Sequence, residues 1–78
     1  MYVLVTRDDC SYCNLAKSLF REKALPFTAY NLSSPSSKWV GHLMLEAGIS
    51  SVPQVFAPDG SRIGGYTELK QYVDNKRY

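Results

Sequence analysis

Hydrophobic and polar positions in the first part of the chain switch between strand-like and helix-like spacing. Residues 2–6 are apolar and mostly β-branched, which indicates a buried strand. Residues 10–23 place apolar side chains at helical spacing and predict an amphipathic helix. After a break at Pro26, residues 27–31 predict a second strand. The side chains expected on the buried face of the helix are Tyr12, Leu15, Ala16, Leu19 and Phe20.

A second helix is predicted between a serine-rich loop and a glycine. Ser33 and Ser34 offer a capping hydroxyl, and the fixed φ of Pro35 suits the first helical position. Gly48 is expected to end this helix in a left-handed conformation. The apolar side chains expected to point inward from it are Trp39, Val40, Leu43, Met44 and Ala47.

Two short strands and a third helix complete the pattern. Residues 54–57 and 61–63 predict a hairpin across a turn at 58–60. A bend at residues 64–65 follows, and Thr67 is expected to cap the last helix. The side chains that this helix is expected to bury are Leu69, Tyr72 and Val73.

The predicted order of elements is β-α-β-α-β-β-α, which is typical of an α/β fold with three helices and a four-stranded mixed sheet. The first two strands flank a helix, so we expect them to be parallel and joined by a right-handed crossover. A chain of 78 residues has room for one hydrophobic core, and we expect a single domain over residues 1–78.

The composition argues against several classes of function. A net charge of +2 with scattered Lys and Arg does not indicate a nucleic-acid binder. No apolar run approaches the roughly 20 residues that a membrane span needs. The first residues enter the strand pattern without a basic leader, so we expect a cytoplasmic protein. In that compartment, paired cysteines more often serve redox chemistry or metal binding than structure.

The cysteine pair lies where the first strand hands over to the first helix. Cys10 is expected at the helix N-terminus, where free N–H groups and the helix dipole favour an anion. This position lowers the pKa of a thiol, which makes Cys10 the expected nucleophile. Cys13, one turn further along, is expected to be more buried and to resolve a mixed disulfide. Arg7 adds positive charge nearby, and Asp8 and Asp9 oppose it.

Two other interpretations of the cysteine pair are a zinc site and a structural role in the core. A zinc site needs four ligands, and His42 on a different helix is the other soft ligand that the sequence offers, so no metal is expected. Two incidental core cysteines are the second alternative, since free cysteine is commonly buried. The strand-to-helix placement favours redox chemistry over both.

Three segments together resemble the glutaredoxin family. Residues 10–13, Cys-Ser-Tyr-Cys, resemble the family's Cys-Pro-Tyr-Cys, and residues 51–56, Ser-Val-Pro-Gln-Val-Phe, are similar to its Thr-Val-Pro-Gln-hydrophobic-Phe. Residues 64–69, Gly-Gly-Tyr-Thr-Glu-Leu, resemble its Gly-Gly-Tyr-Thr/Asp-Asp/Glu-Leu signature. Residues 53–72 look especially similar to bacteriophage glutaredoxins.

The resemblance implies a thioredoxin-like fold, a cis peptide bond before Pro53 and a binding site for glutathione. The backbone of Val52 is expected to pair with the cysteinyl part of glutathione, in the manner of an added strand. The N–H groups of Tyr66 and Thr67, at a helix start, are expected to hold the γ-glutamyl carboxylate. Gly65 lets the backbone of the ligand approach closely.

The sequence departs from the family pattern at two places. Ser11 replaces the usual proline, and some family members with serine there bridge an iron–sulfur cluster between two subunits. Val40 stands where the family often has Gln or Arg to hold the glycyl carboxylate of glutathione. Lys38, His42 and Arg7 are the residues that could take over that contact.

The function predicted from these features is glutathione-dependent thiol–disulfide exchange. The Cys10 thiolate attacks a protein disulfide or a glutathione mixed disulfide, Cys13 resolves the intermediate, and glutathione reduces the resulting bridge. Tyr12 either shields the thiol pair and packs beside glutathione or is a core aromatic. By resemblance, ribonucleotide reductase is an expected client. We expect the protein to be a monomer in the cytoplasm, or in the host cytoplasm if it is viral.

Two alternatives remain open on the sequence alone. The first is a glutaredoxin-like redoxin that is recycled by thioredoxin reductase, which also serves ribonucleotide reductase. The second is a glutaredoxin that binds an iron–sulfur cluster and acts as a carrier, for which Ser11 is the motivation.

Overall fold

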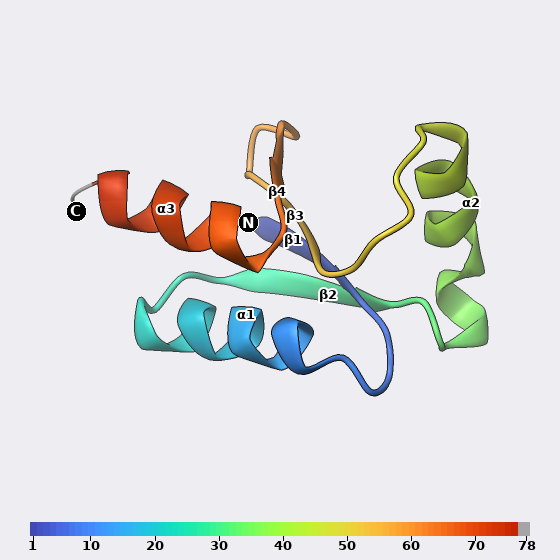
Figure 1. Ribbon diagram of the computed structural model, residues 1–78, viewed down its shortest axis with the longest axis horizontal. Coiled ribbons are helices and arrows are strands. Elements are labelled where there is room, and N and C mark those ends of the chain that lie inside the picture. Colours follow the sequence, from blue (N-terminus) through green and yellow to red (C-terminus); the bar gives the residue numbers. More distant parts are fainter. Residues whose placement is uncertain (77–78) are drawn as a thin grey trace.

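The predicted order of elements is present in the computed structural model, which describes residues 1–76 (Figure 1). The strands pair in the order β2-β1-β3-β4. β1 runs parallel to β2 and antiparallel to β3, and β4 is antiparallel to β3, so the sheet is mixed as expected. The elements are β1 (Tyr2–Thr6), α1 (Ser11–Glu22), β2 (Phe27–Asn31), the 3-10 turn η1 (Pro35–Ser37), α2 (Lys38–Glu46), β3 (Gln54–Phe56), β4 (Arg62–Gly64) and α3 (Tyr66–Lys76).

Alternate side chains of β1 serve two separate hydrophobic clusters, because successive residues of a strand point to opposite faces. Tyr2 and Leu4 pack with α1 and α3, whereas Val5 packs with α2. Figure 1 shows α1 and α3 near each other and α2 standing apart from both. Phe20 is fully buried against Tyr2 and Phe27, with ring centroids 5.3 and 4.8 Å away. Burying one such side chain contributes about 1.5–3 kcal/mol.

The buried face of α1 differs from the predicted one. Ala16, Leu19 and Phe20 are buried as expected, but Tyr12 is 59% exposed and Leu15 is 46% exposed. The buried stripe also contains Cys13, one turn before Ala16, and this rotates the helix so that the two predicted residues face outward. A buried cysteine acts here as a small hydrophobic residue, which apolar periodicity alone did not reveal.

The inward face of α2 is narrower than predicted. Val40 and Met44 are buried, but Trp39 and Leu43 are more than half exposed, and Ala47 lies exposed beyond the last helical residue. Trp39 and Leu43 line a cavity of about 430 Å³ between α2 and the sheet. The helix therefore touches the sheet along one stripe rather than a broad face.

The ends of the helices also correct the sequence predictions. Cys10 is the N-cap of α1 rather than its first residue. The 3-10 turn η1 begins at Pro35 and precedes α2, and neither the Ser34 nor the Ser37 side chain caps the helix that follows it. Gly48, which follows the C-cap residue Ala47 of α2, has φ +74°, the left-handed conformation that the sequence predicts. Thr67 is the second residue of α3 and so cannot be its N-cap.

The hairpin strands are offset from the predicted ranges of 54–57 and 61–63. Their pairing has an irregularity at Val55/Phe56, and the turn is closed by a bond from the Ala57 N–H to the Ser61 carbonyl at 2.8 Å. Ala57 and Ser61 therefore belong to the turn, and the second strand extends to Gly64 instead.

The start of α3 depends on a close contact between a glycine and an acidic side chain. Gly64 has φ +123°, in the region that favours glycine, and a Cβ there would lie 2.9 Å from Cγ of Glu68. The Gly65 N–H donates to Oε1 of Glu68 at 2.7 Å, which is one half of a capping box. Glu68, rather than Thr67, therefore supplies the cap of this helix.

Replacing Gly64 with alanine tests this arrangement. Gly64→Ala should lower the free energy of unfolding by about 1–3 kcal/mol, because the backbone strain adds to the displacement of Glu68. Gly48→Ala is the matched control, since that residue also has positive φ but open space around a new Cβ. It should cost only about 1 kcal/mol. Urea denaturation measures both, and equal losses would contradict a role for the Glu68 contact.

Candidate active site

The register of the sheet brings three separate segments to one end of the molecule. Val5 of β1 pairs with Gln54 of β3, so the residues that follow β1 lie beside those that precede β3. Val55 pairs with Gly64 of β4, which brings the start of α3 to the same end. A Cβ on Gly65 would lie 3.5 Å from the Pro53 carbonyl oxygen, so these two backbones approach closely.

Cys10 and Cys13 form a disulfide at the start of α1. Cys10 has an extended backbone, with φ −118° and ψ 103°, and its sulfur accepts the Cys13 N–H at 3.1 Å. Their Cα atoms are 5.2 Å apart, within the usual range for a disulfide. Cys13 is 1% exposed and Cys10 is partly exposed, as predicted for a resolving and an attacking cysteine. An exposed sulfur at a helix N-terminus is suited to thiolate chemistry.

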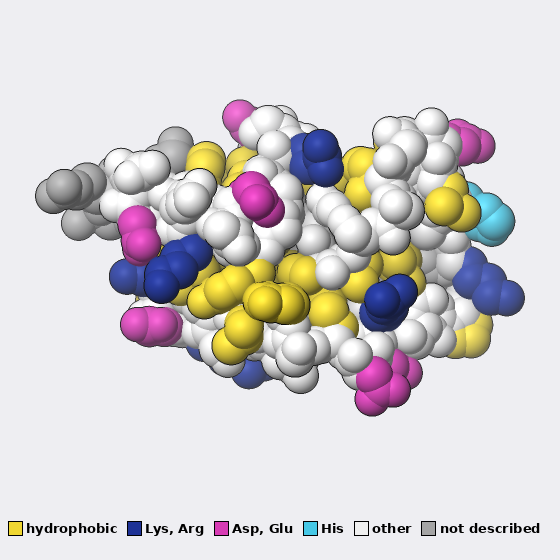
Figure 2. Space-filling view, viewed as in Figure 1, with side chains coloured by type: hydrophobic (Ala, Val, Ile, Leu, Met, Phe, Trp, Pro, Cys, Tyr) yellow, Lys and Arg dark blue, Asp and Glu magenta, His cyan; other side chains and the backbone are white. Residues whose placement is uncertain are grey.

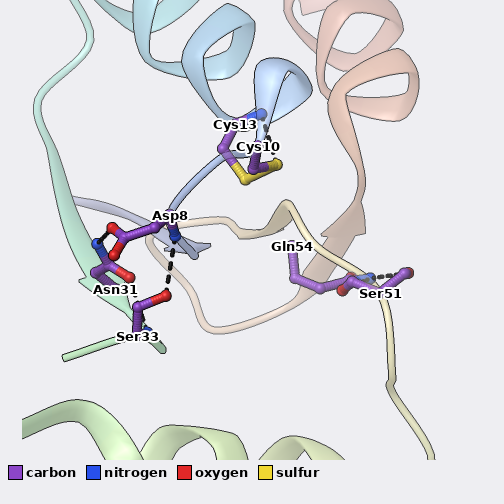
Figure 3. Close-up of a disulfide and its surroundings, with 7 residues drawn as sticks. All are labelled: Asp8, Cys10, Cys13, Asn31, Ser33, Ser51 and Gln54. Carbon is purple, nitrogen blue, oxygen red and sulfur yellow. Dashed lines mark hydrogen bonds between the residues drawn. A yellow bond between two sulfur atoms is a disulfide. The ribbon is translucent and has the colours of Figure 1, made fainter. Parts of the chain in front are cut away.

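The loop that carries Cys10 is tied to the end of β2 by two hydrogen bonds, and a third braces the β2 side (Figure 3). The Asn31 side chain donates to Oδ1 of Asp8 at 2.9 Å, and the Asp8 N–H donates to Oγ of Ser33 at 3.0 Å. The Ser33 N–H in turn donates to Oδ1 of Asn31 at 2.8 Å. The Asp8 side chain points toward Asn31 and away from the disulfide. We call Asp8, Asn31 and Ser33 the loop clamp.

A second hydrogen-bonded group lies behind the segment that precedes β3. The peptide bond between Val52 and Pro53 is cis. The buried amide of Gln54 donates to the Ser51 carbonyl at 3.0 Å and to the Ser51 hydroxyl at 3.1 Å (Figure 3). Arg62 donates to the side-chain oxygen of Gln54 at 3.2 Å. These bonds tie the ends of the Val52–Pro53 segment to the hairpin and restrict its movement.

Two tyrosine rings connect the helix that carries the cysteines to α3. The rings of Tyr12 and Tyr66 lie 6.2 Å apart and connect the first turn of α1 to the first turn of α3. Figure 2 shows hydrophobic side chains gathered across the middle of this face, between α1 and α3. The exposure of Tyr12 favours the prediction that it lies beside a ligand over the alternative of a core aromatic.

Arg7 lies in the loop between β1 and α1. It lines a pocket of about 180 Å³ together with Val52, Leu32, Leu45 and Ile49. Val40, which occupies the position of the family's Gln or Arg, is buried and packs with Val5 and Met44. Its side chain does not line the pocket of Arg7. Lys38 and His42 are exposed on α2 but do not line this pocket, which leaves Arg7 as its cation among the described residues.

The predicted site residues thus gather at one end of the sheet in linked pairs. Arg7 shares a pocket with Val52, Pro53 approaches Gly65, and Tyr12 approaches Tyr66. Thr67 follows Tyr66 in the first turn of α3 and is exposed. Sequence reasoning missed the loop clamp, the Gln54–Arg62 bond and the cap by Glu68. Polar residues next to the motifs were the available signal, but their partners are distant in sequence.

Residues 1–76 contain neither a metal-binding cluster nor a membrane-spanning helix. No group of three or more His, Cys, Asp and Glu side chains is arranged to hold a metal ion. None of the helices in this part of the chain has the length and apolar character to cross a membrane.

Comparisons with known proteins agree with the geometry. A family model described as Glutaredoxin matches residues 2–63. The chain is 36% identical over 72 residues to the glutaredoxin of Enterobacteria phage T4, a match that covers 81% of this chain and 83% of that protein.

Solved structures give the same result. Glutaredoxin 1 from Francisella tularensis, complexed with cacodylate, is 31% identical with a TM-score of 0.76 over 96% of this chain and 93% of that one. The buckwheat glutaredoxin–glutathione complex is 27% identical with a TM-score of 0.77, over 96% and 70% of the two chains. The fold is thioredoxin-like, and the chain belongs to the glutaredoxin family of thiol–disulfide oxidoreductases.

Proposed function

We propose that this protein uses glutathione to reduce protein disulfides and glutathione mixed disulfides through a dithiol mechanism. The observation that carries the proposal is the position of the Cys10 sulfur. It lies partly exposed at the N-cap of α1, accepts a backbone N–H, and is joined to the buried Cys13. The same N–H stabilises a thiolate when the disulfide is reduced, because hydrogen bonds to the charged form lower a pKa.

The chemistry is a series of thiol–disulfide exchanges that conserve electrons. The Cys10 thiolate attacks one sulfur of a substrate disulfide, forms a mixed disulfide and releases the other sulfur as a thiolate, which takes up a proton. Cys13 then attacks the Cys10 sulfur, releases the second substrate thiolate and closes the disulfide. Two glutathione molecules reopen the disulfide in sequence and leave as glutathione disulfide. The substrate gains the two electrons that glutathione loses.

The residues around the disulfide suit glutathione along its whole length. The cysteinyl backbone pairs with the backbone of Val52, which the Gln54 bonds hold in place. The γ-glutamyl carboxylate accepts from the N–H groups of Tyr66 and Thr67 at the start of α3. Arg7 pairs with the glycyl carboxylate. The buckwheat glutaredoxin is a relative solved as a glutathione complex, which supports this choice of ligand.

Glu68 caps one N–H group at the start of α3 and leaves the next ones for a ligand. Its carboxylate already accepts the Gly65 N–H, so the bound carboxylate uses the next two N–H groups of the helix. The negative charge of Glu68 then faces the ammonium of the γ-glutamyl group. The start of α3 is thus capped by Glu68 and also binds glutathione.

Partners and location extend the proposal. Ribonucleotide reductase is the client we favour, on the resemblance of the sequence to the family. We propose that the protein acts as a monomer, because one chain supplies both of the cysteines that the exchange needs. A reducing cytoplasm, which maintains glutathione, is the compartment in which this chemistry runs.

A coupled assay tests the function directly. Glutathione, glutathione reductase and NADPH should support rapid reduction of a mixed disulfide of glutathione and 2-mercaptoethanol. Thioredoxin reductase with NADPH should not replace this system. Efficient turnover with thioredoxin reductase and none with glutathione would overturn the proposal in favour of a redoxin.

Single cysteine variants separate the two steps in the same assay. Cys10→Ser should reduce activity to the uncatalysed background, because the attacking sulfur is lost. Cys13→Ser should retain reduction of glutathione mixed disulfides, since a second glutathione can resolve them, and should lose the dithiol reduction of a protein disulfide. Retained activity in Cys10→Ser would reverse the assigned roles.

The loop clamp generates a prediction about the reactivity of Cys10. Asn31→Ala frees the Asp8 carboxylate to approach Cys10, two residues away, and a nearby negative charge raises the pKa of a thiol. Charges about 4 Å apart in water interact by about 1 kcal/mol, so we expect a measurable rise in the pKa of Cys10. The pH dependence of iodoacetamide alkylation, in a Cys13→Ser background, measures it.

The Asp8→Asn variant is the matched control for this experiment. It removes the charge while keeping a side chain of similar shape, so adding Asn31→Ala to it should leave the pKa of Cys10 nearly unchanged. An equal rise in the presence and absence of Asp8 would show that the clamp acts through backbone position rather than through charge.

A further inference from the structure

The pocket next to Val52 has an apolar lining that the glycyl residue of glutathione, which has no side chain, cannot contact. Arg7 and Val52 belong to the proposed glutathione site, and the other side chains that line the pocket include Leu32, Leu45 and Ile49. Met44 also lines it and packs in the core, where it is 6% exposed. The pocket therefore combines one cationic side chain with apolar ones.

The size of the pocket exceeds what water or a glycyl group would fill. Its volume is about 180 Å³, several times the roughly 30 Å³ that one water molecule occupies in the liquid. Water interacts weakly with apolar side chains. An apolar side chain that entered the pocket would remove its own surface and that of the pocket lining from solvent. A small polar group would instead lose hydrogen bonds on entering.

The position of the pocket determines which part of a substrate reaches it. A substrate cysteine paired with the Val52 backbone has its γ-glutamyl or N-terminal side toward the start of α3. Its C-terminal side then runs toward Arg7, and the pocket lies between Arg7 and Val52. The side chain of the next residue is the group that comes to its opening.

We propose that this pocket selects disulfide substrates in which an apolar residue follows the reactive cysteine. The inference rests on the proposed function and adds its substrate class: extended polypeptide segments of the form Cys-Leu or Cys-Ile, with glutathione as the smaller electron donor. Arg7 pairs with the carboxylate or carbonyl that follows the apolar side chain. Glutathione leaves the apolar part of the pocket empty, so it binds well enough to react and still leaves readily.

Two tripeptides that differ at one side chain test the selection. The mixed disulfides of γ-Glu-Cys-Gly and γ-Glu-Cys-Leu with 2-mercaptoethanol keep the same carboxylate and the same leaving thiol. We expect kcat/KM to be on the order of ten-fold higher for the leucine peptide, as for other small apolar differences in a hydrophobic pocket. The γ-Glu-Cys-Asp peptide should react no faster than the glycine peptide.

Two leucines of α2 provide matched variants. Leu45 lines the pocket and is 69% exposed, so Leu45→Gln should fold normally and lose most of the preference for leucine. Leu43 is 56% exposed on the same helix and lines the cavity between α2 and the sheet instead. Leu43→Gln should therefore keep the wild-type preference.

The outcomes distinguish this inference from the function on which it rests. Equal kcat/KM for the glycine and leucine peptides, or an unchanged preference in Leu45→Gln, would overturn the pocket assignment while leaving glutathione-dependent exchange intact. Failure to reduce any of the three peptides would overturn the proposed function itself.

Discussion

The position of the active site depends on the pairing of β1 with both of its neighbours. Thr6 pairs with Asn31 of β2, and Val5 pairs with Gln54 of β3. One buried strand therefore sets three loop positions at once: the loop that leads to Cys10, the loop that follows β2, and the Val52–Pro53 segment. Because a shift of one residue would turn every β1 side chain to the wrong cluster, the two hydrophobic clusters fix this register.

Hydrogen bonds then refine what the sheet positions. The loop clamp holds the approach to Cys10, Gln54 holds the approach to Pro53, and Glu68 holds the start of α3. Each bond joins a side chain to a loop rather than to a helix or strand interior. The reactive sulfur accepts the Cys13 N–H, and the Asp8 carboxylate is turned away from it. Helix geometry thus supplies the environment that favours a thiolate.

Strand and helix order, the parallel pairing of β1 with β2, the β3–β4 hairpin and the Cys10–Cys13 disulfide could be predicted from sequence, because they follow from periodicity and from one strand-to-helix junction. The exposed faces of Tyr12 and Trp39 could not, since an aromatic residue at helical spacing fits a core and a ligand surface equally well. The cap by Glu68 was also missed, because Thr67 offered a plausible local alternative. Contacts between distant residues, such as Asp8 and Asn31, leave no periodic signal.

The most direct measurement of the account is the location of glutathione on the protein. Glutathione trapped on Cys10 of the Cys13→Ser variant should change the NMR amide shifts most at Val52, Gly65, Tyr66 and Thr67, because the strand register brings these residues to the end of the sheet where the loop to Cys10 lies. Largest changes over residues 39–44 of α2 would contradict the account, since they would put the ligand on the far side of the cavity that separates α2 from the sheet.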